Sequence, residues 1–341
     1  MLDHSGPFNI MLSASGRRVS LLRILQQSIA TMGLPGEVIA TDISRACPAM
    51  HAGTRTIIVP SYRDPGCLEF LLDMVARNHI RLIVPTIDTE LPFYAQHADA
   101  FAARGCRINI SSPEVVNIGN DKLLTHQFLV QAGIPTVRQQ TLEDALASAE
   151  TLELPVVIKP RCGSASIGVS VARTVEQAHA RSSEKNLLVQ FQAQGQEYTV
   201  DIFVDRHGEC QCALPRLRLE TRAGEVSRGV TARNPAVASL ARKVARALPK
   251  AYGVLNIQMF YDVKTNTSAV IEINPRFGGG YPLTHEAGAP MTTWLIEDVL
   301  GLPSSASDQT WREGVVMLRY DEAFFTNVAE TGLQLPKLSP H

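Results

Sequence analysis

The sequence predicts an α/β amino-terminal region followed by an α+β region. Over residues 1–113, short apolar strand-like segments alternate with segments of helical apolar spacing, which is typical of a parallel sheet covered on both faces. From about residue 155, strand-like segments with period-two alternation and turns between them indicate antiparallel pairing. We therefore expect two regions of different architecture.

The amino-terminal region contains candidate strands and helices in alternation. The expected strands are residues 8–13, 37–42, 56–59, 82–86 and 107–110, and the expected helices are residues 19–32, 68–76 and 91–103. The run Ser111-Ser112-Pro113 marks the end of this region.

Polar residues follow several of these strands, at the edge where parallel sheets bind ligands. They are Arg17, Arg18, Asp42, Asp88 and Glu90. Helix capping is an equally good interpretation of Asp42 and Asp88. Because G-x-G-x-x-G does not follow the first strand, we do not expect a nicotinamide dinucleotide here.

The second region opens with a helix and continues mainly as strands. Asn120 or Asp121 caps a helix that runs to Gln131, and Pro235 lies in the first turn of an amphipathic helix that ends near Leu248. A shorter helix follows Thr174, and the expected strands are residues 156–160, 169–172, 187–191, 197–204, 212–219, 255–261 and 268–273. The strand 197–204 should be half-buried, and 212–219 should carry Arg216 and Arg218 on one face.

Composition excludes several classes of protein. The 341 residues carry a net charge of −1, so the chain as a whole does not attract nucleic acid or an anionic membrane electrostatically. No run approaches the roughly 18 apolar residues that span a bilayer, and the first residues do not suggest a signal peptide. The six cysteines show no zinc-site spacing, so we expect reduced thiols in a cytoplasmic protein.

The segment Glu272-Ile-Asn274-Pro-Arg276 closes an apolar run and leads into glycines 278–280. Residues two apart on a strand point to the same face, so the Glu272 carboxylate and the Asn274 amide present oxygens that suit Mg²⁺. Arg276 stays on that side and suits a phosphate or a carboxylate. Taken alone, the segment is equally compatible with a strand that ends in a Pro-Gly turn beside a surface arginine.

A second segment points to nucleotide phosphates. Lys159 ends an expected strand directly before a loop of small residues, whose backbone N–H groups can cradle anions. The P-loop pattern is missing, and a plain turn would have the same composition. Gln258, on the partner strand of the Glu272 hairpin, either adds another oxygen or is a polar edge-strand residue. Together the segments make ATP with Mg²⁺ the simplest interpretation.

These segments, in this order, resemble an ATP-grasp enzyme of the carbamoyl-phosphate-synthetase-like branch, over residues 9 to about 320. The carriers are Asp121-Lys122, Lys159-Pro-Arg-x-Gly-Ser-x-Ser-x-Gly168, Val189-Gln-Phe with Gly195-Gln-Glu197, Gln258, and Glu272-Ile-Asn-Pro-Arg276-Phe-Gly-Gly-Gly. The resemblance implies a Rossmann-like pre-ATP-grasp domain at residues 1–113 and an ATP-grasp fold at 114–325, in which two α+β subdomains clasp ATP. Residues 153–192 would form its lid subdomain, and residues 326–341 a carboxyl-terminal tail.

The resemblance also implies a role for each matching position. The nucleotide would be bound by Lys122, Lys159, Gly163, Ser164, Ser166, Gly168, Gln190, Phe191, Gln192 and Glu197. Within this set the lysines would hold phosphates, residues 164–168 would form the flexible lid over them, residues 190–192 would face adenine, and Glu197 would hold the ribose hydroxyls. Mg²⁺, or Mn²⁺ in its place, would be bound by Gln258, Glu272 and Asn274, and the catalytic residues would be Arg276 and Lys159.

Two positions depart from the family pattern, and two further arginines are candidate anion contacts. Gln190 stands where Glu is common, and Ala165 replaces a frequent glycine of the lid. Arg222 and Arg228 are additional candidates for a phosphate or carboxylate contact. Glycines 278–280 would border the acceptor pocket.

The implied activity is ATP-dependent carboxylate–amine ligation through an acyl phosphate, which yields an amide, ADP and phosphate. Its substrates would be a small carboxylate and an amine of amino-acid-like size, with neither nucleic acid nor membrane as a partner. Dimers are common in the family, so a homodimer is an expectation that the residues themselves do not decide. The alternatives are a kinase of a small carboxylate and a nucleotide-binding regulatory protein without turnover.

Overall fold

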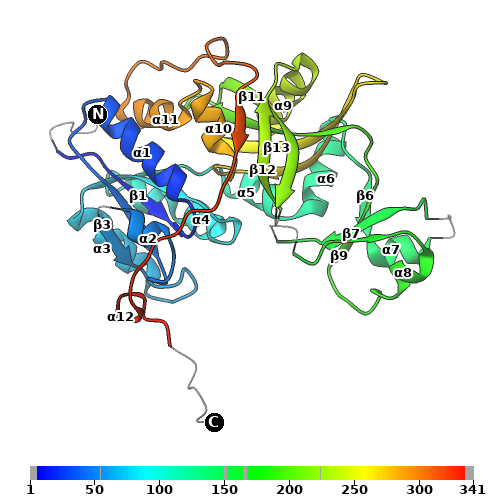
Figure 1. Cartoon of the computed structure of the whole chain (residues 1–341), viewed down its shortest axis with the longest axis horizontal. Helices are drawn as coiled ribbons and strands as arrows, with labels where there is room; N and C mark the ends of the chain where they lie inside the picture. The colour runs from blue at the N-terminus through cyan, green and yellow to red at the C-terminus, as the bar shows by residue number, and fades with distance from the viewer. Residues whose placement is uncertain (1–5, 54, 149–151, 164–166, 223, 335–341) are drawn as a thin grey trace, which may run out of the picture. The chain divides into compact units, whose positions relative to one another are not determined.

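The computed structural model describes residues 6–53, 55–148, 152–163, 167–222 and 224–334 (Figure 1). The chain forms two compact units. The first comprises residues 1–109, 292–305 and 320–341, and the second comprises residues 110–291 and 306–319. No helix among the described residues is both long and apolar enough to cross a bilayer.

The first unit is built on a parallel sheet with strand order β3-β2-β1-β4-β5. The strands are β1 (Asn9–Ser13), β2 (Val38–Asp42), β3 (Arg55–Ile58), β4 (Ile80–Pro85) and β5 (Arg107–Ile108). The helices are α1 (Val19–Thr31), α2 (Ala49–Ala52), α3 (Cys67–Arg77), α4 (Leu91–Ala102), most of α11 (Met291–Leu300) and α12 (Val328–Thr331), with a 3₁₀ turn, η1, at Asp88–Glu90. This confirms the α/β prediction, although β5 is shorter than the expected strand.

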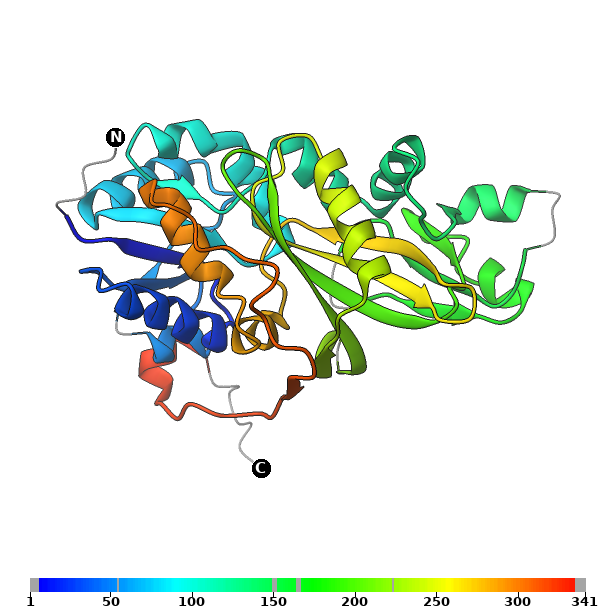
Figure 2. The ribbon, with the colours of Figure 1, turned by 90° about the horizontal axis from the view of Figure 1, so that it is seen from above.

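The strands in the core of this unit are mostly apolar because they are covered on both sides. All five residues of β1 are buried, because helices cover both faces of the sheet (Figure 2). The buried hydroxyls of Ser28 and Thr292 lie 2.8 Å apart and join α1 to α11. A sequence-distant helix thereby becomes part of the first unit.

The second unit contains a larger antiparallel sheet with strand order β14-β13-β10-β11-β12-β15. Its strands are β10 (Gln196–Val204), β11 (Cys210–Arg222), β12 (Glu225–Thr231), β13 (Gly253–Asp262), β14 (Thr267–Asn274) and β15 (Val316–Leu318). The helices around it are α5 (Pro113–Asn120), α6 (Lys122–Gln131), α9 (Pro235–Ala247) and α10 (Tyr281–Glu286). As expected, Asp121 caps α6 and Pro235 occupies the first turn of α9.

The two faces of this sheet differ in chemistry. One face is apolar and packs against α9, whose yellow-green ribbon lies over the strands in Figure 2. The register of β10 with β13 and β11 places Glu197, Thr199 and Asp201 on the opposite face. β10 is buried from Tyr198 onward rather than half-buried as predicted, because residues 278–284 also lie against this second face.

A smaller antiparallel sheet has strand order β6-β9-β7-β8. Its strands are β6 (Gln139–Thr141), β7 (Val156–Pro160), β8 (Ser170–Ala172) and β9 (Leu187–Phe191), and its helices are α7 (Leu142–Ala147) and α8 (Val175–His179). Val156, Ile158 and Val189 belong to an apolar cluster that also contains residues of both helices. Alternation then turns Lys159 and Gln190 to the opposite face of the sheet.

Candidate active site

The β13–β14 hairpin brings the three predicted metal ligands onto one face. Gln258 pairs with Glu272 across the hairpin, and Asn256 pairs with Asn274. These side chains offer one carboxylate and amide oxygens, a donor set that suits Mg²⁺ better than a softer metal. Among the described residues no three His, Cys, Asp or Glu side chains form a separate metal-binding group.

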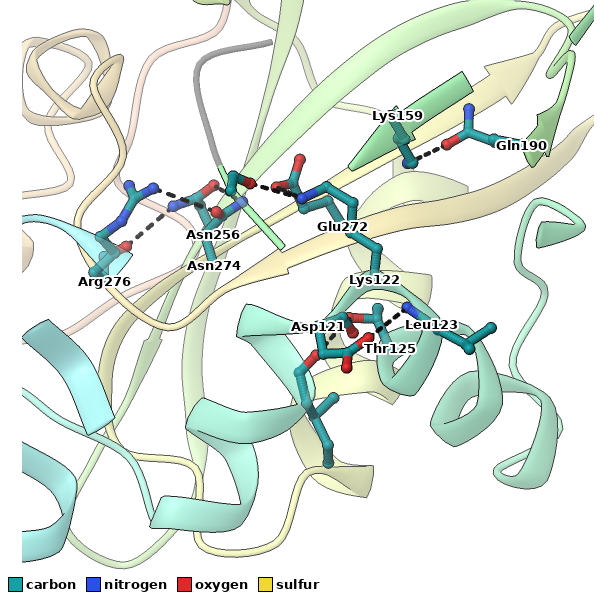
Figure 3. A network of polar contacts seen from close by, with 12 residues as sticks. Asp121, Lys122, Leu123, Thr125, Lys159, Gln190, Asn256, Glu272, Asn274 and Arg276 are labelled. Atoms are coloured by element: carbon teal, nitrogen blue, oxygen red, sulfur yellow. Dashed lines mark hydrogen bonds and ion pairs between the residues drawn. The ribbon is translucent and has the colours of Figure 1, made fainter. Parts of the chain in front are cut away.

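Arg276 lies directly beside Asn274, one of the three predicted metal ligands (Figure 3). Its side chain is largely buried, and Nη2 donates to Asn274 Oδ1 at 3.4 Å while Nη1 donates to the Phe277 carbonyl at 3.2 Å. Asn256 Nδ2 donates to the Arg276 carbonyl at 3.0 Å. The guanidinium is therefore held next to a candidate metal ligand, where it can meet a phosphoryl oxygen.

Lys122 reaches the same hairpin from the start of α6. Asp121 Oδ1 accepts hydrogen bonds from Leu123 N at 2.9 Å and Leu124 N at 3.2 Å, which fixes the first turn of the helix. Lys122 Nζ lies 4.0 Å from Glu272 Oε1 and donates to the Gly163 carbonyl at 2.7 Å. The ammonium thus connects the carboxylate to the loop that follows β7.

Lys159 lies at the end of β7 and is almost completely buried. Its Nζ donates to Gln190 Oε1 at 2.5 Å (Figure 3). Burial lowers the pKa of Lys159 from 10.5 to about 8; the charge of Glu272 opposes this effect, and that of Lys122 adds to it. Because residue 190 is a neutral glutamine, this hydrogen bond does not neutralise the ammonium, and its charge is available to an incoming phosphate.

The other predicted nucleotide positions have different surroundings. Phe191 packs in the apolar cluster of the small sheet, with the Arg138 guanidinium 3.6 Å from its ring centre, whereas Gln192 is exposed. Gly163 and Gly168 have φ values of +117° and +75°, which favour glycine. Ser164 and Ser166 lie outside the described residues.

Gln139 is a site-adjacent residue that the motifs did not indicate. It lies opposite Gln190 in the small sheet and is only 4% exposed. Neither atom of its side-chain amide has a hydrogen-bond partner among the described residues. A buried amide without partners is costly, so this one is available to a ligand on the Lys159 face.

Glu197 lies on the polar face of the larger sheet. Its Oε1 accepts a hydrogen bond from Arg218 Nη1 at 2.7 Å. Burial raises the pKa of Glu197, the charge of Arg218 opposes that rise, and the charge of Glu272 adds to it. No motif pointed to Arg218, although it was expected on the same face as Arg216.

A pocket of about 420 Å³ lies at the β12–β15 edge. It is lined by Glu220, Arg222, Ser227, Arg228, Leu318 and Arg319. Arg319 also donates to the carbonyl of Gly279, so the pocket borders the glycine triplet after Arg276. Three arginines and one glutamate give its lining a net positive charge, which suits an anionic group.

Two family models match this chain. The model described as "ATP-grasp in the biosynthetic pathway with Ter operon" matches residues 183–323, and the model described as "PylC-like, N-terminal domain" matches residues 10–109. The chain is therefore similar to ATP-grasp proteins over residues 183–323. The two matches confirm the resemblance seen in the sequence and the predicted two-part fold.

Solved ATP-grasp structures share the fold. The biotin carboxylase domain of Hydrogenobacter thermophilus 2-oxoglutarate carboxylase, solved with MgADP, ADP and bicarbonate, has a TM-score of 0.69 and 17% identity, over 91% of this chain and 74% of that one. The L-amino acid ligase of Bacillus licheniformis has a TM-score of 0.68 and 17% identity, over 90% and 77%. At such identities the likeness concerns the fold alone.

Curated relatives match parts of this chain. The carbamoyl phosphate synthase large chain of Acidobacterium capsulatum is 27% identical over 217 residues, which cover 55% of this chain and 19% of that protein. The chain therefore spans about a fifth of the length of that relative.

Proposed function

We propose that this chain is an ATP-dependent carboxylate–amine ligase that works through an acyl phosphate. One observation supports this most strongly: Glu272, Gln258 and Asn274 share a face, with Lys122 Nζ 4.0 Å from Glu272 and Arg276 beside Asn274. Phosphoryl transfer needs positioned cations more than a protein nucleophile. This hairpin and its surroundings supply that type of site.

The side chains divide the work in this proposal. Lys122 and Lys159 bind the phosphates of ATP, and Arg276 stabilises the charge of the transferring phosphoryl group. Gln258, Glu272 and Asn274 would hold Mg²⁺, or Mn²⁺, which when bound neutralises phosphate charge and orients the oxygens.

The proposed reaction has two balanced steps. An oxygen of the substrate carboxylate attacks the γ-phosphorus, the bond to the β-phosphate oxygen breaks, and ADP leaves. The amine nitrogen then attacks the acyl carbon, inorganic phosphate leaves, and the nitrogen loses a proton to give the amide. Arg276 is suited to both steps, because each places negative charge on phosphate oxygens near its guanidinium.

The substrates in this proposal are a small carboxylate and an amine of amino-acid-like size. A structural neighbour is named an L-amino acid ligase, which supports this class. The arginine-lined pocket beside Gly279 supports an anionic group on one substrate. The homodimer and the cytoplasmic location are further proposals; the first is supported by a neighbour described as a domain dimer, and the second by six free cysteines.

The experiment that tests the proposal measures ADP release with Mg·ATP and a panel of amino acids and simple carboxylates, alone and in pairs. Products are identified by mass. ADP that appears only with a specific pair, together with a mass equal to their sum less water, supports the ligase. ADP from a single carboxylate without a condensed product identifies the kinase alternative. ATP binding without ADP release across the panel favours the regulatory alternative.

A further inference from the structure

Arg218 and Glu197 form a partly buried ion pair on the polar face of the larger sheet. The distance from Arg218 Nη1 to Glu197 Oε1 is 2.7 Å, and the side chains are 10% and 27% exposed. Tyr198 pairs with Leu217 in the β10–β11 register, so the two charged residues occupy the next position on the same face. The contact therefore follows from the strand pairing rather than from a chance approach of surface side chains.

The guanidinium is fixed by a second hydrogen bond. Arg218 Nη2 donates to the Gly224 carbonyl at 3.1 Å. Two nitrogens of one planar fork are thereby held by two acceptors, which leaves the group little freedom to rotate. The residue that pairs with Arg218 on β12 is Gly229, which has no side chain to crowd the guanidinium.

The Glu197 carboxylate has a second oxygen, Oε2, that can accept hydrogen bonds from a ligand. Among the described residues Arg218 donates the hydrogen bond to the Glu197 carboxylate at Oε1, while no side-chain or backbone donor is bonded to Oε2. A carboxylate needs donors, and vicinal hydroxyls are donors of the right geometry. Burial of Glu197 and the nearby charge of Glu272 both favour a neutral carboxyl, which Arg218 counteracts.

We propose that Arg218 is a positioning residue for the nucleotide: it orients Glu197, so that this carboxylate accepts hydrogen bonds from the ribose hydroxyls of ATP. This inference rests on the proposed function, since it takes ATP as the ligand. It adds a residue of β11, outside the family motifs, that sets the preference for a ribose over a sugar without hydroxyls.

The test compares binding of ATP and 2′,3′-dideoxy-ATP in the presence of Mg²⁺, measured by calorimetry without other substrates. Hydrogen bonds to a charged acceptor predict roughly tenfold tighter binding of ATP by the wild-type protein. In Arg218→Met, which keeps the length of the side chain but removes the fork, the ratio should fall to about twofold or less. Arg218→Lys keeps the charge and should retain an intermediate ratio.

A matched control separates positioning from a general effect on folding. Arg242 forms a similar partly exposed pair with Asp308 at 2.7 Å and also donates to the Cys210 carbonyl at 2.7 Å, and neither partner is a candidate site residue. Arg242→Met should lose stability without any change in the ratio between the two nucleotides. Thermal unfolding of all variants verifies that each protein is folded.

Two outcomes would overturn the inference. One is an Arg218→Met protein that binds ATP with the wild-type ratio, or that loses both nucleotides equally. The other is a wild-type protein that binds both nucleotides equally, which would remove the ribose role of Glu197 as well. A wild-type protein that binds neither ATP nor 2′,3′-dideoxy-ATP would instead contradict the proposed function, and the inference with it.

Discussion

Arg216 and Asp201 form a buried bidentate ion pair beneath the glycine triplet. Arg216 Nε and Nη2 each donate to an Asp201 oxygen at 2.9 Å, and the side chains are 2% and 0% exposed. Thr284 Oγ1 donates to Asp201 as well. A β-carbon on Gly280 would lie 2.2 Å from Arg216 Nη1, so the backbone that follows Arg276 rests on this guanidinium.

Asp201→Asn should destabilise the protein by about 3–5 kcal/mol, because it leaves the Arg216 charge buried without a partner. Urea unfolding measures the free energy. The control is Glu286→Gln, whose partner Arg312 lies 3.6 Å away in an exposed pair, and which should stay within about 0.5 kcal/mol of wild type. A loss below about 1 kcal/mol for Asp201→Asn would show that Arg216 finds other partners.

Gly280→Ala should cost about 1–3 kcal/mol through overpacking. Arg216 cannot move aside cheaply, since two of its nitrogens are bound to Asp201, and the new β-carbon would also lie 2.7 Å from Val226 Cγ1. Thermal unfolding measures the loss. Gly66→Ala, where no atom lies within 4 Å of the added carbon, is the control and should be nearly neutral.

The affinity for Mg·ATP should decline above pH 8. The pKa of Lys159 is lowered to about 8, so the neutral amine is favoured in the folded protein above that pH, whereas phosphate binding needs the cation. Because the folded protein holds fewer protons than the unfolded chain between pH 8 and 10.5, Lys159 makes the free energy of unfolding larger as the pH rises through that range. Over the same range the dissociation constant of ATP should increase, by up to roughly tenfold per pH unit. Calorimetry between pH 6.5 and 9.5 measures that constant.

Two variants check this assignment. Lys159→Arg stays charged and should show no such increase. Gln190→Glu places a carboxylate where Oε1 now accepts from Lys159, so the increase should begin at a higher pH. The same pH course in all three proteins would contradict the role of Lys159.

Glu90 should make the first unit less stable as the pH rises. Its carboxylate accepts from Ser13 Oγ at 2.6 Å and Thr86 N at 2.9 Å, yet burial raises its pKa from 4.5 to about 7. The protonated form is favoured in the folded state, so this stabilisation is complete below pH 4.5 and is lost as the pH passes 7. The difference corresponds to roughly 3 kcal/mol.

Glu90→Gln resembles the protonated acid and should flatten this dependence, so that its melting temperatures at pH 5 and pH 8 differ less than those of wild type. Glu69→Gln, which changes an exposed carboxylate of α3, should follow the wild-type course. Calorimetric scans at both pH values decide between the outcomes. An unchanged pH dependence in Glu90→Gln would show that this carboxyl does not titrate between folded and unfolded states.

Most of the features that could be predicted from the sequence depend on local patterns of residues. Alternation along one strand was enough to place Glu272 and Asn274 on one face, and capping chemistry was enough to begin α6 at Lys122. The parallel and antiparallel halves followed from the spacing of apolar residues. These features depend on neighbours in the chain, which a sequence displays directly.

Contacts between distant strands could not be predicted in the same way. The bond from Lys159 to Gln190 depends on the β7–β9 register, and the pairs Arg216–Asp201 and Arg218–Glu197 depend on the β10–β11 register. A shift of one residue would turn each side chain to the other face. The resemblance implies that residues 190–192 face adenine, and it gave no indication that the Gln190 side chain is bonded to Lys159. β15 is too short to show alternation.

The most direct test of the proposed site is ADP release by Glu272→Ala, measured with the substrate pair that gives the fastest release in the wild-type protein. We expect a loss of at least about 10²-fold with an unchanged melting temperature, because the substitution removes the carboxylate proposed to bind the metal and little core volume. Asp262→Ala, at the end of β13 on the same hairpin, should keep wild-type activity. Retention of more than about a tenth of the wild-type rate by Glu272→Ala would contradict the assignment of this hairpin to the metal and to phosphoryl transfer.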